Sequence, residues 1–133
     1  MGNEYKDWFC DVMTALNAKM WEADFLPEGW TNTFIPKMKQ ELAGVLGSYV
    51  ENFEVLRIKE KYGCLRFYWS WSDKDYTTDE EHDLMVLSKE IDAIISKYED
   101  ISEKTCVVCG KPSVKMTSGW VMPVCDYCFK NGV

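Results

Sequence analysis

Histidine is scarce in this sequence: the 133 residues contain a single one, His82. It falls in the first turn of a predicted acidic helix, where we expect a solvated surface side chain. The sequence also has no Ser/His/Asp arrangement and no glycine-rich phosphate loop, and its cysteine pairs lack the accompanying His and Glu of the zinc deaminases. These absences predict that the protein is not an enzyme.

Long apolar runs are absent as well. No segment approaches the roughly 20 apolar residues of a membrane-spanning helix, and residues 1–7 contain no apolar core of a secretory signal. We therefore expect a cytoplasmic protein that does not bind a membrane. The apolar share is nonetheless 47%, with 14% aromatic residues, which predicts a packed core rather than disorder. A chain of this length forms one domain, or one domain with a small appendage.

Cysteine is the residue type whose pattern indicates a specific chemistry. Cys106 and Cys109 form one C-x2-C pair, and Cys125 and Cys128 form a second, with fifteen residues between the pairs. This is the spacing of a four-cysteine zinc site. Gly110 follows the first pair and permits a tight turn there, and the stretch between the pairs is long enough for two short strands. We therefore predict a zinc ribbon in which these four sulfurs bind one structural Zn²⁺.

A zinc ion with four thiolate ligands has no open position for water or a substrate, so such a site stabilises structure and does not catalyse. The alternative for six cysteines is a disulfide scaffold, which is rare in cytoplasmic proteins. The remaining two cysteines lie outside the pairs. On the first predicted helix, we expect Cys10 to be a small buried apolar group.

The first part of the chain predicts two helices joined by a loop. Apolar residues recur at helical spacing over residues 5–20, which indicates an amphipathic helix of about four turns. Residues 21–32 contain a proline and a glycine and are predicted to be a loop. A second helix then begins at a cap near Asn32 or Thr33, and Gly44 and Gly47 weaken its end.

From Phe53 the apolar pattern changes to a period of two. Residues 53–60 and 64–71 are predicted to be two strands of a hairpin, with the turn at residues 61–63. Strict alternation along a strand then assigns each side chain to one of two faces. One face of the first strand is predicted to carry Phe53, Val55, Arg57 and Lys59.

A long helix follows the hairpin. Thr78 begins a sequence typical of a capping box, in which Glu81 reaches back to the N–H of the cap. Apolar residues then recur in steps of three and four from Leu84 to Ile101. This pattern predicts a helix of about six turns that ends shortly before the first cysteine pair.

Together these elements predict an α+β fold with two N-terminal helices, a β-hairpin, one long helix and a C-terminal four-cysteine zinc ribbon. We place the α+β body at residues 1–103 and the zinc-ribbon module, packed on the body, at residues 104–133. The body carries 11 Lys and Arg against 21 Asp and Glu, whereas the module carries four Lys against one Asp. These lysines can offset the negative charge of a four-thiolate zinc site. We favour this interpretation over a nucleic-acid patch, because four scattered lysines neutralise few phosphates.

Two surfaces are candidates for binding a partner protein. The first is acidic, and it would favour a partner with a basic surface and disfavour DNA. The dipole of the long helix accounts for the acids of its first turn, residues 79–81, but not for Asp73 and Asp75, which precede the helix. The second is Trp120, which either anchors a partner or covers the small core of the ribbon itself. The acidic surface consists of six residues within a stretch of eleven: Asp73, Asp75, Asp79, Glu80, Glu81 and Asp83.

The alternative function is a nucleic-acid-binding zinc ribbon, for which direct contact with phosphates is required. Its candidate residues come from the module and from the hairpin. They are Lys104, Lys111, Lys115, Trp120, Lys59, Lys61 and Arg66.

The C-terminal 80 residues resemble a group of small bacterial and phage proteins. Residues 58–68 read IKEKYGCLRFY, followed by CxxCG at 106–110, Gly-Trp at 119–120 and CxxC at 125–128. In that group, a motif close to IKEKFGxLRFY precedes CxxCG, then Gly-Trp, then a final pair of metal ligands. The resemblance implies a phage or prophage origin and a zinc site, but it does not imply an activity.

Small size, acidity and zinc together are similar to what we expect of a type II anti-CRISPR metalloprotein, which binds Cas9. This second resemblance implies a stoichiometric inhibitor that blocks the loading or cleavage of target DNA. The implied partner is a host defence nuclease with a basic surface, such as a Cas nuclease. The protein would then act in the cytoplasm of a bacterial host.

Overall fold

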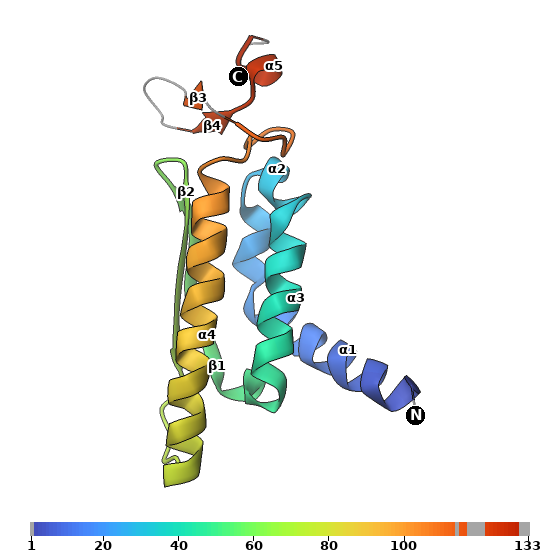
Figure 1. Cartoon of the computed structure of the whole chain (residues 1–133), viewed down its shortest axis with the longest axis vertical. Coiled ribbons are helices and arrows are strands. Elements are labelled where there is room, and N and C mark those ends of the chain that lie inside the picture. The colour runs from blue at the N-terminus through green and yellow to red at the C-terminus, as the bar shows by residue number, and fades with distance from the viewer. Residues whose placement is uncertain (1, 114, 117–121, 131–133) are drawn as a thin grey trace.

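The computed structural model describes residues 2–113, 115–116 and 122–130 (for 2–7 and 115–116, the backbone only), and this part of the chain has the predicted α+β fold. Within it, no helix combines the length and the apolar character that crossing a membrane requires. The elements in chain order are α1 (Gly2–Lys19), the 3-10 helix η1 (Trp21–Phe25), α2 (Glu28–Thr31), α3 (Phe34–Leu46), the 3-10 helix η2 (Gly47–Asn52), β1 (Phe53–Lys61), β2 (Cys64–Trp71), α4 (Thr78–Ser102), β3 (Lys115–Met116), β4 (Pro123–Val124) and α5 (Asp126–Lys130) (Figure 1).

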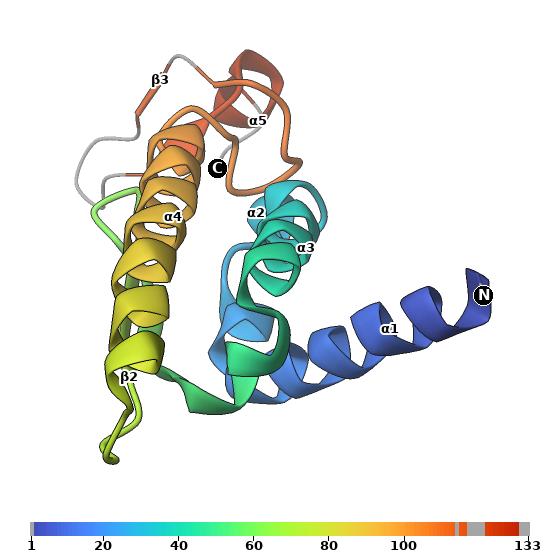
Figure 2. The ribbon, with the colours of Figure 1, turned by 60° about the horizontal axis from the view of Figure 1, so that its bottom comes forward.

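The first predicted helix is confirmed as α1. Its buried stripe recurs every four positions, at Val12, Leu16 and Met20 just beyond the helix end, as residues on one helical face must. The N-terminal end of α1 extends away from the other elements (Figure 2). The prediction for Cys10 is wrong, because its side chain is exposed. Cys10 lies two positions before Val12, about 200° around the helix, and therefore faces away from the buried stripe.

Residues 21–32 do not form the predicted loop. They form η1 and α2, and Trp30 of α2 is fully buried. The indole N–H of Trp30 donates a 3.1 Å hydrogen bond to the carbonyl of Thr105, so this residue belongs to the core. Pro27 occupies the N-cap of α2, where a backbone N–H has no helical partner to lose. Thr33 is the N-cap of α3, as predicted, although its hydroxyl donates to a carbonyl of α2 and caps nothing.

β1 and β2 form the predicted antiparallel hairpin. Lys61 pairs with Cys64, which leaves Tyr62 and Gly63 as a two-residue turn. Both turn residues have positive φ, 53° and 82°, as a type I′ turn requires. The N–H of Gly63 donates to the carboxylate of Glu60 at 2.8 Å, which holds the turn against β1.

The two faces of β1 differ from the predicted strict alternation. The register shifts across Leu56, which is an extra residue in a β-bulge. Beyond the bulge the alternation is reversed, so Ile58 is buried on the same face as Phe53. Arg57 and Lys59, which were expected to share the face of Phe53, lie on the opposite, outer face of the hairpin.

Both outer edges of the hairpin have backbone donors that bond to side chains of neighbouring elements. The N–H of Ile58 in β1 donates to the carboxylate of Glu22 in η1 at 2.9 Å. The N–H of Leu65 in β2 donates to the hydroxyl of Ser102 in α4 at 2.8 Å. These bonds reduce the capacity of either edge to pair with another strand, and they fasten the hairpin between η1 and α4.

α4 is the predicted long helix, but its cap lies one residue earlier than predicted. The hydroxyl of Thr77 accepts from the N–H of Glu80 at 3.1 Å, and the carboxylate of Glu80 accepts from the N–H of Thr77 at 2.9 Å. Thr77 and Glu80 therefore form the capping box in place of Thr78 and Glu81.

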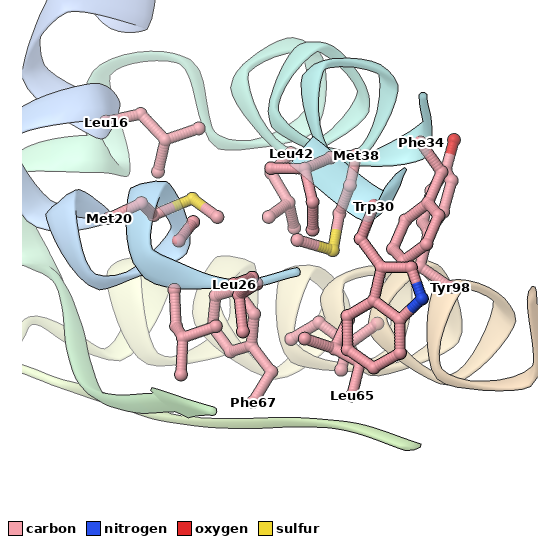
Figure 3. Close-up of a cluster of buried hydrophobic side chains, with 14 of the residues drawn as sticks. Leu16, Met20, Leu26, Trp30, Phe34, Met38, Leu42, Leu65, Phe67 and Tyr98 are labelled. Carbon is pink, nitrogen blue, oxygen red and sulfur yellow. The ribbon is translucent and has the colours of Figure 1, made fainter. Parts of the chain in front are cut away.

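The main core lies between α3, α4 and the hairpin (Figure 3). Phe34 of α3 stacks on Tyr98 of α4, with ring centroids 6.0 Å apart and planes inclined by 18°. Trp30 packs beside this pair, 5.7 Å from the ring of Phe34. The same buried cluster continues into the C-terminal segment, where its members are Cys106, Val107, Val124, Cys125 and Cys128.

Candidate metal centre

The first cysteine pair lies on a tight turn after α4. The N–H of Gly110 donates to the carbonyl of Cys106 at 3.0 Å. Gly110 has a φ of 81°, in the left-handed region that favours glycine. This glycine therefore allows the turn that brings Cys109 back toward Cys106, as the sequence predicts.

The second cysteine pair lies at the start of α5. Cys125 directly precedes this helix and Cys128 lies within it. The N–H of Phe129 donates to the carbonyl of Cys125 at 2.9 Å. Because residues three apart share one side of a helical turn, the two sulfurs of this pair point in the same direction.

Hydrogen bonds between backbone segments bring the two cysteine pairs together. β3 and β4 are antiparallel, with Lys115 opposite Val124. The N–H of Val107 donates to the carbonyl of Pro123 at 2.9 Å, just ahead of the second pair. The turn that carries the first cysteine pair, here called the first cysteine turn, is therefore hydrogen-bonded to β4, the strand that leads into Cys125.

The turn that carries Cys106 and Cys109 also packs directly against α2, a contact that no sequence pattern predicted. The N–H of Gly29 donates to the carbonyl of Val107 at 2.9 Å. A Cβ on Gly29 would lie 2.1 Å from the carbonyl oxygen of Cys106, and a Cβ on Gly110 would lie 2.4 Å from a methyl carbon of Thr33. Two glycines thus permit two backbone segments to touch. The one residue in the sequence that marks this contact is Gly29, directly before the buried Trp30.

The four cysteine sulfurs form one cluster. Their Sγ atoms all lie within 4.8 Å of one another, and the Sγ atoms of Cys109 and Cys125 are 3.5 Å apart. A tetrahedral zinc ion with Zn–S bonds of about 2.3 Å places its sulfurs about 3.8 Å apart, so the cluster has the size that such an ion needs. All six cysteines lie in the described residues, and all six are free thiols. Cys109 is the exposed member of the cluster, and the other three members are buried.

Comparison with protein-family models, with curated proteins and with solved structures found no match to this chain.

The electrostatics of the cluster favour a bound cation. Burial opposes ionisation of Cys106, but hydrogen bonds from the backbone of Cys109, Cys125 and Val108 outweigh it and lower the pKa of Cys106 to about 6. Burial and the neighbouring sulfurs instead raise the pKa of Cys128 to about 12. The four thiols therefore do not all ionise at neutral pH by themselves. A divalent cation that replaces the thiol protons removes this repulsion.

Five residues of the predicted acidic surface are exposed and Glu80 is half-buried, and two of the six carboxylates have structural contacts. Glu80 completes the capping box and lies 4.0 Å from the ammonium group of Lys74. Asp83 accepts a 3.0 Å hydrogen bond from the hydroxyl of Tyr49. Among the described residues, the members without a side-chain hydrogen bond or an ion pair are Asp73, Asp75, Asp79 and Glu81.

The other predicted partner-binding residue, Trp120, lies outside the described residues. Of the lysines in residues 104–133, Lys104, Lys111 and Lys130 are exposed. His82 is exposed on α4, as expected for a solvated surface residue.

Proposed function

We propose that the four cysteines bind one Zn²⁺ and that this closed site stabilises a binding protein that is not an enzyme. The convergence of four sulfurs supports the proposal, since it supplies a complete tetrahedral shell without a position for water or a substrate. Metal binding at such a site contributes on the order of 10 kcal/mol to folding. This contribution is large for a segment whose strands, β3 and β4, have two residues each.

The choice of zinc rests on the ligand set and its spacing. Four tetrahedral sulfurs suit either zinc or iron, but two C-x2-C pairs separated by fifteen residues are the pattern of a zinc ribbon. An iron–thiolate centre absorbs visible light, whereas a zinc–thiolate centre is colourless. Metal analysis together with an absorption spectrum therefore separates the two metals.

Cysteine substitution tests which residues hold the metal. We expect one zinc per chain in the purified protein and a large loss of bound zinc in Cys109→Ser, which removes one ligand. Cys10→Ser is the matched control, because Cys10 is an exposed thiol on α1 outside the cluster, and it should retain the full zinc content. Wild-type protein without zinc, or equal zinc loss in the two variants, contradicts the proposed site.

We further propose that the protein acts by binding a basic surface of another protein through its acidic surface. Four exposed carboxylates around the start of α4 support this proposal, because clustered negative charge accelerates and orients association with a positive partner. The partner class implied by the anti-CRISPR resemblance is a host defence nuclease such as Cas9, whose nucleic-acid channel is basic. Binding there would block the loading or cleavage of target DNA.

Binding to purified nucleases tests this proposal. We expect a one-to-one complex with a Cas9 nuclease on size-exclusion chromatography, and inhibition of DNA cleavage at equal concentrations. The double substitution Asp73→Lys and Asp75→Lys should weaken the complex at least tenfold. Glu51→Lys is the control, because it changes an exposed acid of η2 outside the acidic surface. If no Cas or restriction nuclease binds, the nuclease-inhibitor proposal is wrong.

A further inference from the structure

The bulge in β1 gathers cations on the outer face of the hairpin. Beyond Leu56, the side chains that alternate away from the core are those of Arg57, Lys59 and Lys61. On β2, Arg66 stands opposite Lys59. Alternate residues of a strand lie roughly 6.7 Å apart, so these four residues, here called the cationic row, are regularly spaced.

The cationic row is not neutralised, although the protein has a net charge of −7. Among the described residues, none of its four members forms an ion pair. Arg66 lies in the field of the partly buried Glu99 of α4, and Glu54 is an exposed acid on the outer face on the far side of the bulge. The row is therefore available to an external anion.

A groove of about 450 Å³ borders the cationic row, between η1 and β1. Arg57 and Lys59 line it together with two exposed aromatic residues, Trp21 and Phe25. The exposed fractions of these aromatic residues are 58% and 80%, and their rings meet edge to face with centroids 5.9 Å apart. The structure thus places two uncovered aromatic rings beside a row of cations.

Two carboxylates also line the groove, and both already accept backbone hydrogen bonds. Glu22 accepts from the N–H of Ile58, and Glu60 accepts from the N–H of Gly63. Both carboxylates are therefore held against the hairpin backbone. Against the four cations stand Glu22 and Glu60 in the groove and Glu99 beside Arg66, so the groove and the cationic row together keep a net positive charge.

We propose that this groove and the cationic row bind single-stranded nucleic acid. The row contacts phosphates, and Trp21 and Phe25 offer stacking surfaces to unpaired bases, the two features on which single-strand binding depends. A duplex would use the cations but not the rings, because its bases are already stacked in pairs. The proposal does not rest on the proposed function, since the acidic surface lies at the opposite end of the hairpin from its turn (Figure 1).

Fluorescence anisotropy with the zinc-loaded full chain tests the proposal. The probes are a labelled single-stranded DNA of about 15 nucleotides, the RNA of the same sequence, and the corresponding DNA duplex. If the four cations each contact a phosphate, the logarithm of the affinity should fall with the logarithm of the salt concentration with a slope of about −3. Affinity for single strands should then fall about 50-fold between roughly 50 and 200 mM salt.

Substitutions at exposed positions separate the two features. Phe25→Ala should weaken single-strand binding by about 5- to 150-fold, since it removes a stacking surface. Arg57→Gln should weaken it and make the salt slope shallower by about 0.7. Lys89→Gln is the control, because it removes an exposed lysine of α4 outside the row, and it should bind like wild type. Circular dichroism confirms that each variant is folded.

Three results would each overturn the proposal. The first is no binding of either single strand at about 50 mM salt, where phosphate contacts are strongest. The second is a duplex that binds as tightly as the single strands. The third is wild-type affinity in Phe25→Ala. Preference between the DNA and RNA single strands decides only which sugar the surface accepts, because either single strand fits the proposed chemistry.

Discussion

At the scale of single residues, Gly29 controls whether the C-terminal segment can pack against the helices. Its backbone lies so close to the first cysteine turn that an added Cβ would meet backbone atoms of three residues: the carbonyl oxygen of Cys106 at 2.1 Å, the nitrogen of Gly110 at 2.7 Å and the carbonyl carbon of Val107 at 2.8 Å. Backbone atoms cannot rotate out of the way as a side chain can. One missing side chain therefore allows a contact between segments far apart in the sequence.

We predict opposite effects for two glycine-to-alanine substitutions. Gly29→Ala should lower the free energy of unfolding by about 3 kcal/mol, because the new methyl group forces α2 and the first cysteine turn apart. Gly44→Ala should raise it by about 0.5–1 kcal/mol, because no atom lies within 4 Å of the new Cβ and alanine favours the helix α3. Chemical denaturation of both variants measures the difference. Equal effects would contradict the close contact at Gly29.

Glu99 is a second residue whose environment determines a measurable property. Burial between α4 and the hairpin raises the pKa of its carboxyl above the usual value, although Arg66 and the N–H of Phe67 oppose the shift. A carboxyl with a raised pKa in the folded state binds its proton more tightly there than in the unfolded chain. Its contribution to stability is therefore full at low pH and is lost as the pH rises through the folded-state pKa.

We predict that Glu99→Gln stabilises the protein at pH 7 relative to wild type, because glutamine keeps an oxygen acceptor for Phe67 and carries no charge to bury. The difference should shrink as the pH falls toward 4, where the wild-type carboxyl is protonated. Thermal unfolding of both proteins between pH 4 and pH 7 measures it. A difference that does not change with pH would contradict the role of burial.

At the scale of secondary-structure elements, periodicity and turn residues were sufficient to predict α1, α3, the hairpin and α4. The errors arose where a one-residue change reverses the outcome. In β1, the extra residue Leu56 changes which side chains face the core, and strict alternation contains no signal for a bulge. At the start of α4, Thr77 and Thr78 are adjacent, each with a glutamate three residues later, so the capping-box pattern alone could not distinguish them. The proline and glycine in residues 21–32 predict a loop around Trp30, and α2, with four residues, is too short to show a helical period.

The position of the cap gives a direct prediction. Thr77→Ala should lower the free energy of unfolding by about 1 kcal/mol, because it removes the hydroxyl that accepts from the N–H of Glu80. Thr78→Ala is the matched control and should change it by less than about 0.5 kcal/mol, since Thr78 is an exposed residue inside the helix. Urea denaturation compares the two. A larger effect at Thr78 would favour the cap that the sequence alone suggested.

At the scale of the whole molecule, the sequence predicted that the four cysteines cluster, but not how this cluster connects to the rest of the fold. The spacing of cysteines predicts a local cluster because each pair is close in sequence. The bonds of Gly29 to Val107 and of Trp30 to Thr105 join residues more than seventy positions apart, which no local pattern encodes. As a result, the buried cluster that begins on α1 extends without interruption to the cysteines.

This continuity predicts how far the effect of metal removal spreads. Chelation should increase amide hydrogen exchange in the C-terminal segment and also at α2, because Gly29 bonds directly to the first cysteine turn. The middle of α4 should stay protected, since it packs on α3 and the hairpin. Hydrogen-exchange mass spectrometry before and after chelation measures both regions. If exchange at α2 does not change, the cysteine turn does not stabilise α2.

We propose above all that four cysteine sulfurs form a closed shell around one zinc ion. X-ray absorption spectroscopy at the zinc edge tests it directly, because it reports the number and type of atoms bound to the metal. We expect four sulfur neighbours at about 2.3 Å and no nitrogen or oxygen neighbour. A shell with fewer than four sulfurs, or with a bound oxygen or nitrogen, would show an open site and contradict the closed four-cysteine shell.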